Sequence, residues 1–287
     1  MAFVHIVTDG SASLPPGAEA NHGLTIVPQN VLFGEESLRG GVDITPEAFF
    51  ARLAAAAVPP RTSQASPAQF HEAYLRVLAW EVEVVSIHLP RSLSGTIDSA
   101  RAAVGMLPPG APVTVLETPW TSSALGLLAT RAAQAGADGA SRAEVAALVE
   151  TVSARLGLIF AVDDLGYLQR GGRIGRAEAL LGSMLQVKPI LELRDGAVQP
   201  LERVRTTTNA LRRIIERVGE RLPDDGAVHL GMLSADADAE AAALATFLDS
   251  RHHPVELWIA PADPALAVHT GPGAFGVAFY ADPVNHV

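Results

Sequence analysis

Short apolar segments alternate with helical segments through the first half of the chain, and this order restricts the fold more than any other feature. Segments 4–7, 82–89 and 113–116 are apolar runs of strand length. Such runs are typical of parallel strands, which are buried on both faces. A repeated strand–helix order of this kind predicts a parallel sheet with helices on both of its faces.

Signals for helix starts lie between and after these strands. Thr45 stands directly before Pro46, which fits the first position of a helix. Ser66 and Ser141 are each followed three residues later by Gln or Glu, which is the spacing of a capping box. Further helices are expected after Ser94-Gly95 and over residues 121–135.

The second half of the chain predicts a different arrangement. Segments 188–193 and 197–204 flank Asp195-Gly196, a pattern that predicts a β-hairpin. A helix is expected over 207–221, where apolar residues recur at helical spacing. The other expected elements are a strand at 158–162, a short helix through 180–185, strands at 228–233 and 255–259 that flank a helix from about Asp238, and a last strand at 277–280.

Together these patterns predict two α/β domains. We expect the first to span 1–156 with a mainly parallel sheet and the second to span 157–287 with a mixed sheet. The chain has 287 residues, 48% of them apolar, which is enough for two cores of ordinary size. Ligands of parallel α/β sheets bind beyond the carboxyl ends of the strands, so functional residues are expected there.

Composition excludes several classes of function. The chain contains no cysteine, which excludes disulfides, thiolate metal sites and cysteine nucleophiles. Its formal net charge of −10 argues against nucleic acid as a partner, because phosphate neutralisation dominates such binding. No apolar run approaches the roughly 18 to 20 residues that span a bilayer. The N-terminal segment is expected to be a strand and not a signal peptide, so a cytoplasmic location is expected.

The charge is unevenly distributed along the chain. Residues 170–217 carry ten basic and five acidic side chains, although the whole chain is acidic. A basic face on an acidic protein indicates a docking site for an acidic partner, a phosphate donor or an anionic membrane surface. The alternative is a solvated helix face without a partner.

Five short polar segments punctuate the apolar stretches. They offer hydroxyls, backbone N–H groups and one imidazole, which are suited to holding a small anion at helix starts and glycine-rich turns. Ordinary helix capping or plain polar loops are the alternative for each segment. The pattern favours a protein that binds an acidic ligand over an enzyme. The segments are 8–12, 62–64, 92–96, 170–175 and 269–273.

The sequence matches the motifs of known catalytic sites poorly. Around Ser94, the positions that a Gly-x-Ser-x-Gly elbow would fill with glycine are occupied by Ser92 and Thr96. The loop 170–175 lacks the Gly-Lys-Ser/Thr ending of a phosphate-binding P-loop. The histidines show no metal-ligand spacing, so no metal site is expected. A serine-dependent acyl or phosphate ester hydrolase that uses Ser94 with His269 remains the alternative function.

Taken in order, the polar segments resemble the DegV family, the bacterial fatty-acid-binding proteins that carry the substrate of fatty acid kinase in phospholipid metabolism. The resemblance covers essentially the whole chain. It departs at Gly10, where the family usually has serine. The matching segments are Thr8-Asp9 with Ser11, 62–64, 93–96, 168–175, 188–191 and 269–273.

The resemblance implies a long-chain fatty acid held in an apolar tunnel between two α/β domains. It implies that the protein is not an enzyme, needs no cofactor, and presents the carboxylate to a separate ATP-dependent kinase subunit. The residues implied near the carboxylate are Ser11, Thr62, Ser63, Ser94, Gly95, Thr96, His269 and Thr270. Basic residues implied in docking to the kinase or transiently to a membrane are Arg170, Arg173, Arg176 and Arg205. For Arg173 and Arg205, the resemblance gives a position near the carboxylate end as the alternative.

The chemistry of such a ligand suits these residues. Burial is worth about 0.8 kcal/mol per methylene, so a sixteen-carbon chain could contribute on the order of 10 kcal/mol before ordering costs. The carboxylate is costly to bury unless hydroxyl and N–H donors bind it. Phosphoryl transfer, with its nucleotide and magnesium, would belong to the partner kinase.

Overall fold

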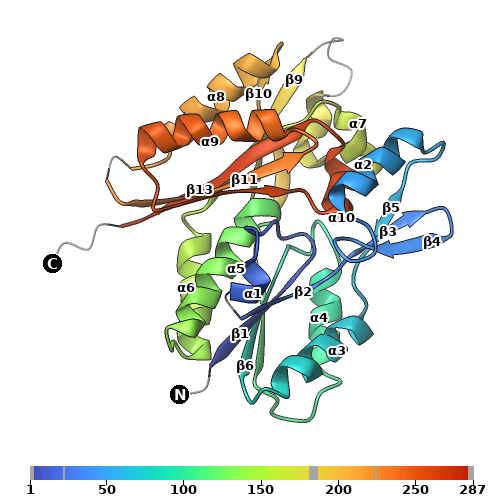
Figure 1. The fold of residues 1–287 in the computed structure, drawn as a ribbon, viewed down its shortest axis with the longest axis vertical. Coiled ribbons are helices and arrows are strands. Elements are labelled where there is room, and N and C mark those ends of the chain that lie inside the picture. The colour runs from blue at the N-terminus through green and yellow to red at the C-terminus, as the bar shows by residue number, and fades with distance from the viewer. Residues whose placement is uncertain (1–2, 22, 181–186, 224, 284–287) are drawn as a thin grey trace.

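The computed structural model describes residues 3–21, 23–180, 187–223 and 225–283. Two large β-sheets lie one above the other in Figure 1, with helices between and around them. Four strands form the lower sheet in the order β2-β1-β6-β7, and all of their pairings are parallel. These strands are β1 (Val4–Asp9), β2 (Leu24–Val27), β6 (Glu83–His88) and β7 (Val113–Glu117).

Helices cover both faces of the lower sheet, as the strand–helix order predicts (Figure 1). Thr45 caps α2, and both predicted capping boxes are present, at Ser66 before α3 and at Ser141 before α6. These local predictions are confirmed. The helices of this half are α1 (Ala18–Asn21), α2 (Pro46–Ala55), α3 (Pro67–Leu78), α4 (Thr96–Val104), α5 (Ser122–Ala137) and α6 (Arg142–Ser153).

Helix α5 joins the two halves of the molecule. It packs against β1 of the lower sheet and against β11 and β13 of the upper sheet, so apolar side chains cover it on nearly every side. Gly126 of α5 allows this close packing, because a Cβ there would lie 2.0 Å from the Ser13 carbonyl oxygen. One continuous apolar cluster therefore includes residues from both sheets.

Six strands form the upper sheet in the order β10-β9-β8-β13-β11-β12. Its pairings are antiparallel except between β11 and β12, so the predicted mixed sheet is confirmed. Helices α8 (Thr207–Gly219) and α9 (Asp238–His252) pack on one face and bury a second apolar cluster. The strands are β8 (Gly157–Ala161), β9 (Lys188–Arg194), β10 (Ala197–Val204), β11 (Ala227–Ala235), β12 (Glu256–Pro261) and β13 (Ala274–Asp282).

A third, small sheet lies beside the junction of the two halves, and the sequence patterns did not predict it. Its order is β4-β3-β5, formed by Glu36–Arg39, Asn30–Phe33 and Arg61–Ser63. Segment 62–64, for which a polar loop was one interpretation, therefore begins within a strand. Two short helices, α7 (Leu165–Arg170) and α10 (Pro264–Thr270), pack against each other near this sheet. The strands are too short to show a clear alternation of apolar and polar residues.

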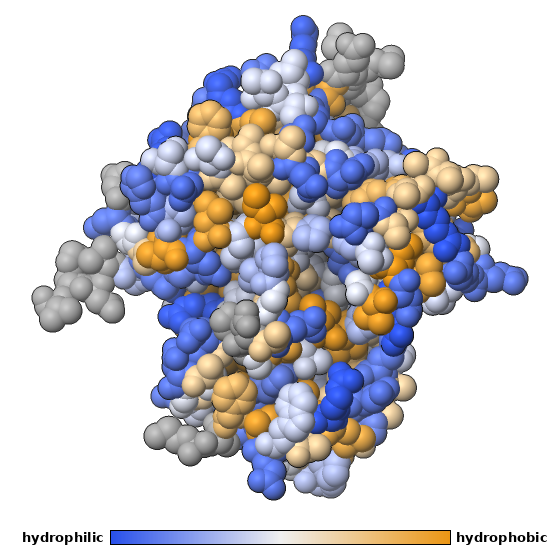
Figure 2. Space-filling view, in the orientation of Figure 1, coloured by the Kyte–Doolittle hydropathy of each residue, from blue (hydrophilic) through white to orange (hydrophobic). Residues whose placement is uncertain are grey.

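Two predictions are only partly covered by this description. The short helix expected through 180–185 lies mostly outside the described residues, which show a 3₁₀ turn at Gly175–Leu180. The domain boundary at 156 stays a prediction. On the face in Figure 2, apolar and hydrophilic residues are mixed over both halves. Within the described residues, no helix combines the length and the apolar character required to cross a membrane.

Candidate functional site

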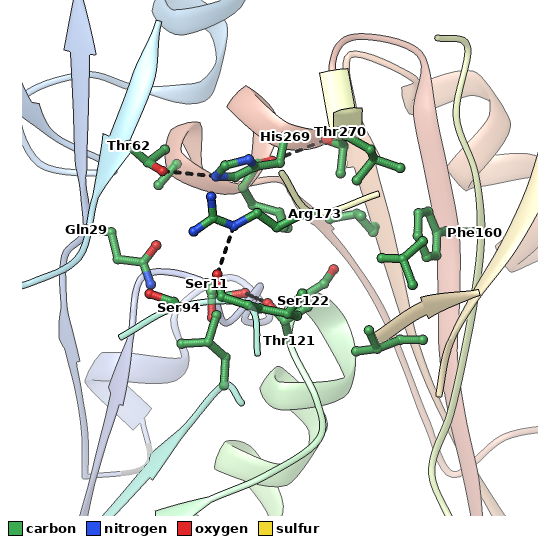
Figure 3. A pocket seen from close by; sticks show the side chains of 18 of the residues that line it. Ser11, Gln29, Thr62, Ser94, Thr121, Ser122, Phe160, Arg173, His269 and Thr270 are labelled. Atoms are coloured by element: carbon green, nitrogen blue, oxygen red, sulfur yellow. Dashed lines mark hydrogen bonds between the residues drawn. The ribbon is translucent and has the colours of Figure 1, made fainter. Parts of the chain in front are cut away.

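A cavity of about 290 Å³ lies between the lower and upper sheets (Figure 3). Its polar residues come from loops, helix ends and the small sheet, whereas half of its apolar residues come from strands of the upper sheet. The polar lining includes Ser11, Gln29, Thr62, Ser94 and His269. The apolar lining includes Leu158, Phe160, Leu193, Val198 and Leu233.

The polar end of the cavity forms where separate elements converge. Ser11 follows β1, and Ser94 precedes α4 in the loop after β6, so both stand at the carboxyl edge of the parallel sheet. Thr62 of β5 and His269 of α10 complete this end, and the Thr62 Oγ1 lies 3.0 Å from the His269 Nε2. Figure 3 shows these side chains on one side of the cavity and Phe160 on the other.

His269 is an uncharged member of this end at neutral pH. Burial of the imidazole, together with the positive charge of Arg173, lowers its pKa from 6.5 to about 4. Its Nδ1 atom is buried and has no hydrogen-bond partner among the described residues. The backbone of Gly171 passes close to this atom, since a Cβ at that residue would lie 2.2 Å from Nδ1. The imidazole can therefore donate or accept hydrogen bonds without adding charge.

Arg173 supplies a fixed positive charge in the described lining. Its Nε donates to the Leu93 carbonyl at 2.9 Å, and its Nη1 donates to the Gly171 carbonyl. The bond to Leu93 joins the loop after α7 to the loop before α4, the bond to Gly171 lies within the loop after α7, and together they hold the guanidinium against the cavity. For Arg173 the resemblance implied either docking or a position near the carboxylate end, and Arg173 lies in the cavity wall.

Ser94 is held by the helix start that follows it. Its Oγ lies 2.9 Å from the Thr96 Oγ1 and accepts a 3.3 Å bond from the Thr96 N–H. Gly95 is the N-cap of α4 and has no side chain, so the Ser94 hydroxyl, one residue earlier, binds the first N–H of the helix. A Cβ at Gly95 would lie 2.3 Å from the Gln64 Oε1, so the glycine makes room for the Gln64 amide.

The structure brings most of the predicted site residues together. Ser11, Thr62, Ser63, Ser94, His269 and Thr270 all line the cavity. Gly95 and Thr96 lie directly behind Ser94 and are absent from the lining. Arg176 and Arg205 are exposed residues outside the lining.

Several lining residues were not predicted. Gln29 lies between β2 and β3, and Thr121 and Ser122 lie at the start of α5. A lone Gln in an apolar segment carries no local signal, and the hydroxyls before α5 were interpreted only as a helix start. Gly10 is the position that departs from the family pattern. It packs against the backbone of Gln29, because a Cβ at residue 10 would lie 3.0 Å from the Gln29 backbone nitrogen.

A second, outer cleft shares a wall with the cavity. Thr62, Arg173 and His269 line both spaces. The outer cleft also contains Arg61 and Arg170, and the Arg170 guanidinium lies over a tyrosine ring at 4.6 Å. One layer of polar side chains therefore separates the cavity from a basic outer surface.

The cavity can bind an anionic group through several donors. The Oγ atoms of Ser11 and Ser122 are buried and have no hydrogen-bond partner among the described residues, as for His269 Nδ1. Buried polar atoms without partners are uncommon in folded proteins and often mark a binding site. Hydroxyls, an imidazole and a guanidinium at one end of an apolar cavity suit an amphipathic acid.

The same geometry does not assemble a hydrolytic triad in the described part of the chain. Ser94 bonds to Thr96, and the His269 Nε2 bonds to Thr62; none of the described hydrogen bonds joins Ser94 to His269. No described carboxylate orients the other imidazole nitrogen, which a triad requires. Within the described ranges, no cluster of three or more His, Asp or Glu side chains is arranged to hold a metal ion.

The fold and the cavity define an α/β protein with two large sheets, a small third one and a ligand-sized space between its halves. The chain belongs to the DegV family: the model of this family, which is described as uncharacterised, matches residues 3–282. The DegV domain-containing protein SCO2569 of Streptomyces coelicolor is 39% identical over 279 residues, covering 96% of this chain and 97% of the relative.

Solved structures of the family are closely similar. A DegV family protein from Thermus thermophilus, described for its fatty acid binding, has a TM-score of 0.91 and 32% identity, covering 98% of this chain and all of that chain. DegV of Bacillus subtilis, described as a fatty acid binding protein, has a TM-score of 0.88 and 29% identity, with the same coverage. These two descriptions concern proteins with the same fold as this chain.

Proposed function

We propose that this protein binds a long-chain fatty acid in the cavity between its two sheets. The observation that carries the proposal is the division of one cavity into a polar end and apolar walls. The carboxylate would lie among Ser94, Thr62 and His269, with Ser11 and Arg173 nearby. The acyl chain would lie along the strands of the upper sheet.

The energetics of the two parts support this orientation. Strand residues such as Leu158, Phe160 and Leu233 offer apolar surface, which binds methylene groups at about 0.8 kcal/mol each. A carboxylate in such walls would remain unpaired and would be strongly disfavoured. At the polar end, charge-assisted hydrogen bonds from hydroxyls and the Arg173 guanidinium offset its desolvation.

We further propose that the protein is a carrier and presents the carboxylate to a separate ATP-dependent kinase, which forms the acyl phosphate. The shared wall supports this, because the carboxylate would lie one side-chain layer from the basic outer cleft. Arg61 and Arg170 in that cleft would favour an approaching phosphate group. Arg176 and Arg205 are exposed candidates for contact with an acidic kinase surface or an anionic membrane. A cytoplasmic location fits this role.

The first experiment is mass spectrometry of the intact protein under native conditions, together with an organic extract of the same sample. One equivalent of a co-purified fatty acid, or uptake of added hexadecanoic acid, is the expected result. An empty protein that also fails to take up acids between ten and twenty carbons would contradict the proposal. Turnover of a chromogenic ester that is lost in Ser94→Ala would instead support the hydrolase.

A further inference from the structure

A buried carboxylate lies behind the polar end of the cavity, outside its lining. Asp9 is completely inaccessible to solvent and stands at the end of β1. It accepts hydrogen bonds from three donors: the Ser11 backbone N–H at 3.0 Å, the Gln29 Nε2 at 3.1 Å and the His88 Nδ1 at 2.8 Å. Three donors around one carboxyl group suit its ionised form, which only accepts.

The far side of Asp9 has one consistent hydrogen-bond direction. The Tyr74 hydroxyl donates to the Ser86 Oγ at 2.8 Å, so Ser86 uses its own proton to donate to the His88 Nε2 at 2.7 Å. The imidazole then carries its proton on Nδ1 and donates it to Asp9. In this direction each proton of the chain has an acceptor, and the side chains of all four residues are buried.

The near side of Asp9 leads to the cavity. Because the carboxylate only accepts, the Gln29 amide must turn its Nε2 toward Asp9, and the same Nε2 lies 3.4 Å from the Thr96 Oγ1. Thr96 is fully buried, and Ser94 is the one described acceptor within reach of its hydroxyl, so once Thr96 accepts from Gln29 its own proton goes to the Ser94 Oγ at 2.9 Å. Ser94 already accepts from the Thr96 N–H, so its own proton is left to point into the cavity.

We infer that Asp9 is a positioning residue: its buried carboxylate, acting through Gln29 and Thr96, keeps the Ser94 hydroxyl oriented as a donor toward the ligand. The inference rests on the proposed function, because it names what aims a donor at the acid. Asp9 itself lies outside the cavity lining. Its effect is therefore on the kind of head group that binds, and an acid is favoured over a neutral alcohol of the same length.

Removing both acceptors of Asp9 releases Gln29. The Ser11 backbone N–H and the Gln29 Nε2 bind the same Oδ1 of Asp9, so in Asp9→Asn the amide oxygen would keep that position and Gln29 would stay in place. In Asp9→Leu no acceptor remains, and the Gln29 amide can flip to turn its Oε1 toward Thr96. Thr96 would donate to Gln29 and accept from Ser94, which withdraws the Ser94 proton from the cavity. A fatty acid carboxylate would then face a lone pair, whereas a fatty alcohol could donate its own proton to Ser94.

The test compares the dissociation constants of hexadecanoic acid and 1-hexadecanol by competition against a fluorescent fatty acid. The wild type should prefer the acid, and Asp9→Leu should reduce the ratio of the two affinities about tenfold or more, as for a lost bond to a charged group. Tyr74→Phe is the matched control, because it removes a hydroxyl at the far end of the same chain and should leave the ratio unchanged. Thr96→Val leaves Ser94 without a described protein acceptor for its proton, so the double variant Asp9→Leu/Thr96→Val should regain the wild-type ratio.

Each result separates the inference from the proposed function. If Asp9→Leu binds both ligands with equal losses or retains the wild-type ratio, or if adding Thr96→Val to it does not restore the ratio, the positioning role is wrong. If Asp9→Leu does not fold, Gln29→Leu removes the same donor to Thr96, and an unchanged ratio in that variant contradicts the positioning role. A wild-type protein that binds neither ligand would contradict the proposed function itself.

Discussion

The two ends of the cavity are built in opposite ways. The polar end collects single side chains from β5, α10 and the loops after β1 and β6, and a buried hydrogen-bond chain supports it from behind. The apolar walls contain a continuous set of side chains from β8, β9 and β10 of the upper sheet, and these side chains also pack into the core. The polar end can therefore set the position of a head group, while the apolar end can supply most of the binding free energy.

This difference separates specificity from affinity. A hydrogen bond contributes about 1 kcal/mol when both partners are neutral and about 1.5 to 3 kcal/mol when one is charged. Apolar contact adds about 0.8 kcal/mol for each methylene buried. Changes at the two ends should thus be distinguishable by varying the head group or the chain length of the ligand.

The largest effect is expected from a charge placed in the apolar wall. Val198 lies on the edge strand β10 and lines the cavity, so Val198→Asp would put an unpaired carboxylate against the acyl chain. Affinity for hexadecanoic acid should fall by about a hundredfold or more, measured by isothermal titration. Gln199→Asp, one residue along the same strand and outside the lining, is the control and should bind normally.

The next effect concerns the head group. Ser94→Ala should weaken hexadecanoic acid binding about tenfold, because one hydrogen bond to the carboxylate is lost. Binding of the methyl ester should change much less. The two affinities can be measured by fluorescence competition at one pH. If Ser94→Ala lost the same affinity for the acid and for the ester, the carboxylate would not bind at Ser94. The proposed division of the cavity into a head-group end and an apolar end would then be wrong.

A third prediction uses pH. The pKa of His269 in the folded protein, about 4, lies below its ordinary value of 6.5, so the unfolded chain binds the proton more tightly between these values. The stability that the neutral imidazole contributes is therefore present near pH 7 and is lost as the pH falls through this window. At pH 5 the loss is about 2 kcal/mol.

Denaturant unfolding at pH 7 and pH 5 tests this prediction. The fall in the free energy of unfolding should be smaller in His269→Asn than in the wild type. Burial also raises the pKa of Asp263 to about 7, which acts in the opposite direction over the same range. The difference between wild type and variant isolates the His269 contribution, and parallel pH profiles would contradict it.

The smallest effect is expected at the exposed basic residues. Arg205→Ala should leave the affinity for hexadecanoic acid within about twofold of the wild type, because surface changes rarely exceed about 0.5 kcal/mol. Arg173→Ala should weaken acid binding clearly, since its guanidinium lies in the wall. Titration of both variants by calorimetry would show whether the two arginines have separate roles. A large loss in Arg205→Ala would extend the site to the surface.

Local sequence signals predicted the parts of the fold that depend on neighbouring residues. The capping boxes at Ser66 and Ser141 and the hairpin at Asp195-Gly196 satisfy nearby backbone groups, so their patterns are visible in a short window. The strand around Thr62 pairs with the strand around Asn30, a segment far along the chain that no local pattern encodes. The pairing of β3 with β4 is local, across a tight turn at Gly34-Glu35, but these strands have only four residues each and their pattern was not recognised.

The same distinction applies to the site. Ser94 and His269 stand in polar segments with glycine, and this composition distinguishes them from the apolar stretches on either side. Leu158 and Val198 resemble any other core residue in the sequence, and only the pairing of β8, β9 and β10 brings them to the cavity. Gln29 reaches the site because the chain crosses from β2 to β3 at that point.

The close approach of Gly171 to His269 allows sequences of this fold to be classified by the residues at these two positions. These positions lie far apart in the chain, yet a side chain at 171 would overlap the imidazole, since its Cβ would be 2.2 Å from Nδ1. The two positions therefore form a single diagnostic pair. In a chain of this fold, any residue larger than glycine at 171 signals that the ring at 269 is displaced or replaced, and that the head-group chemistry has changed with it.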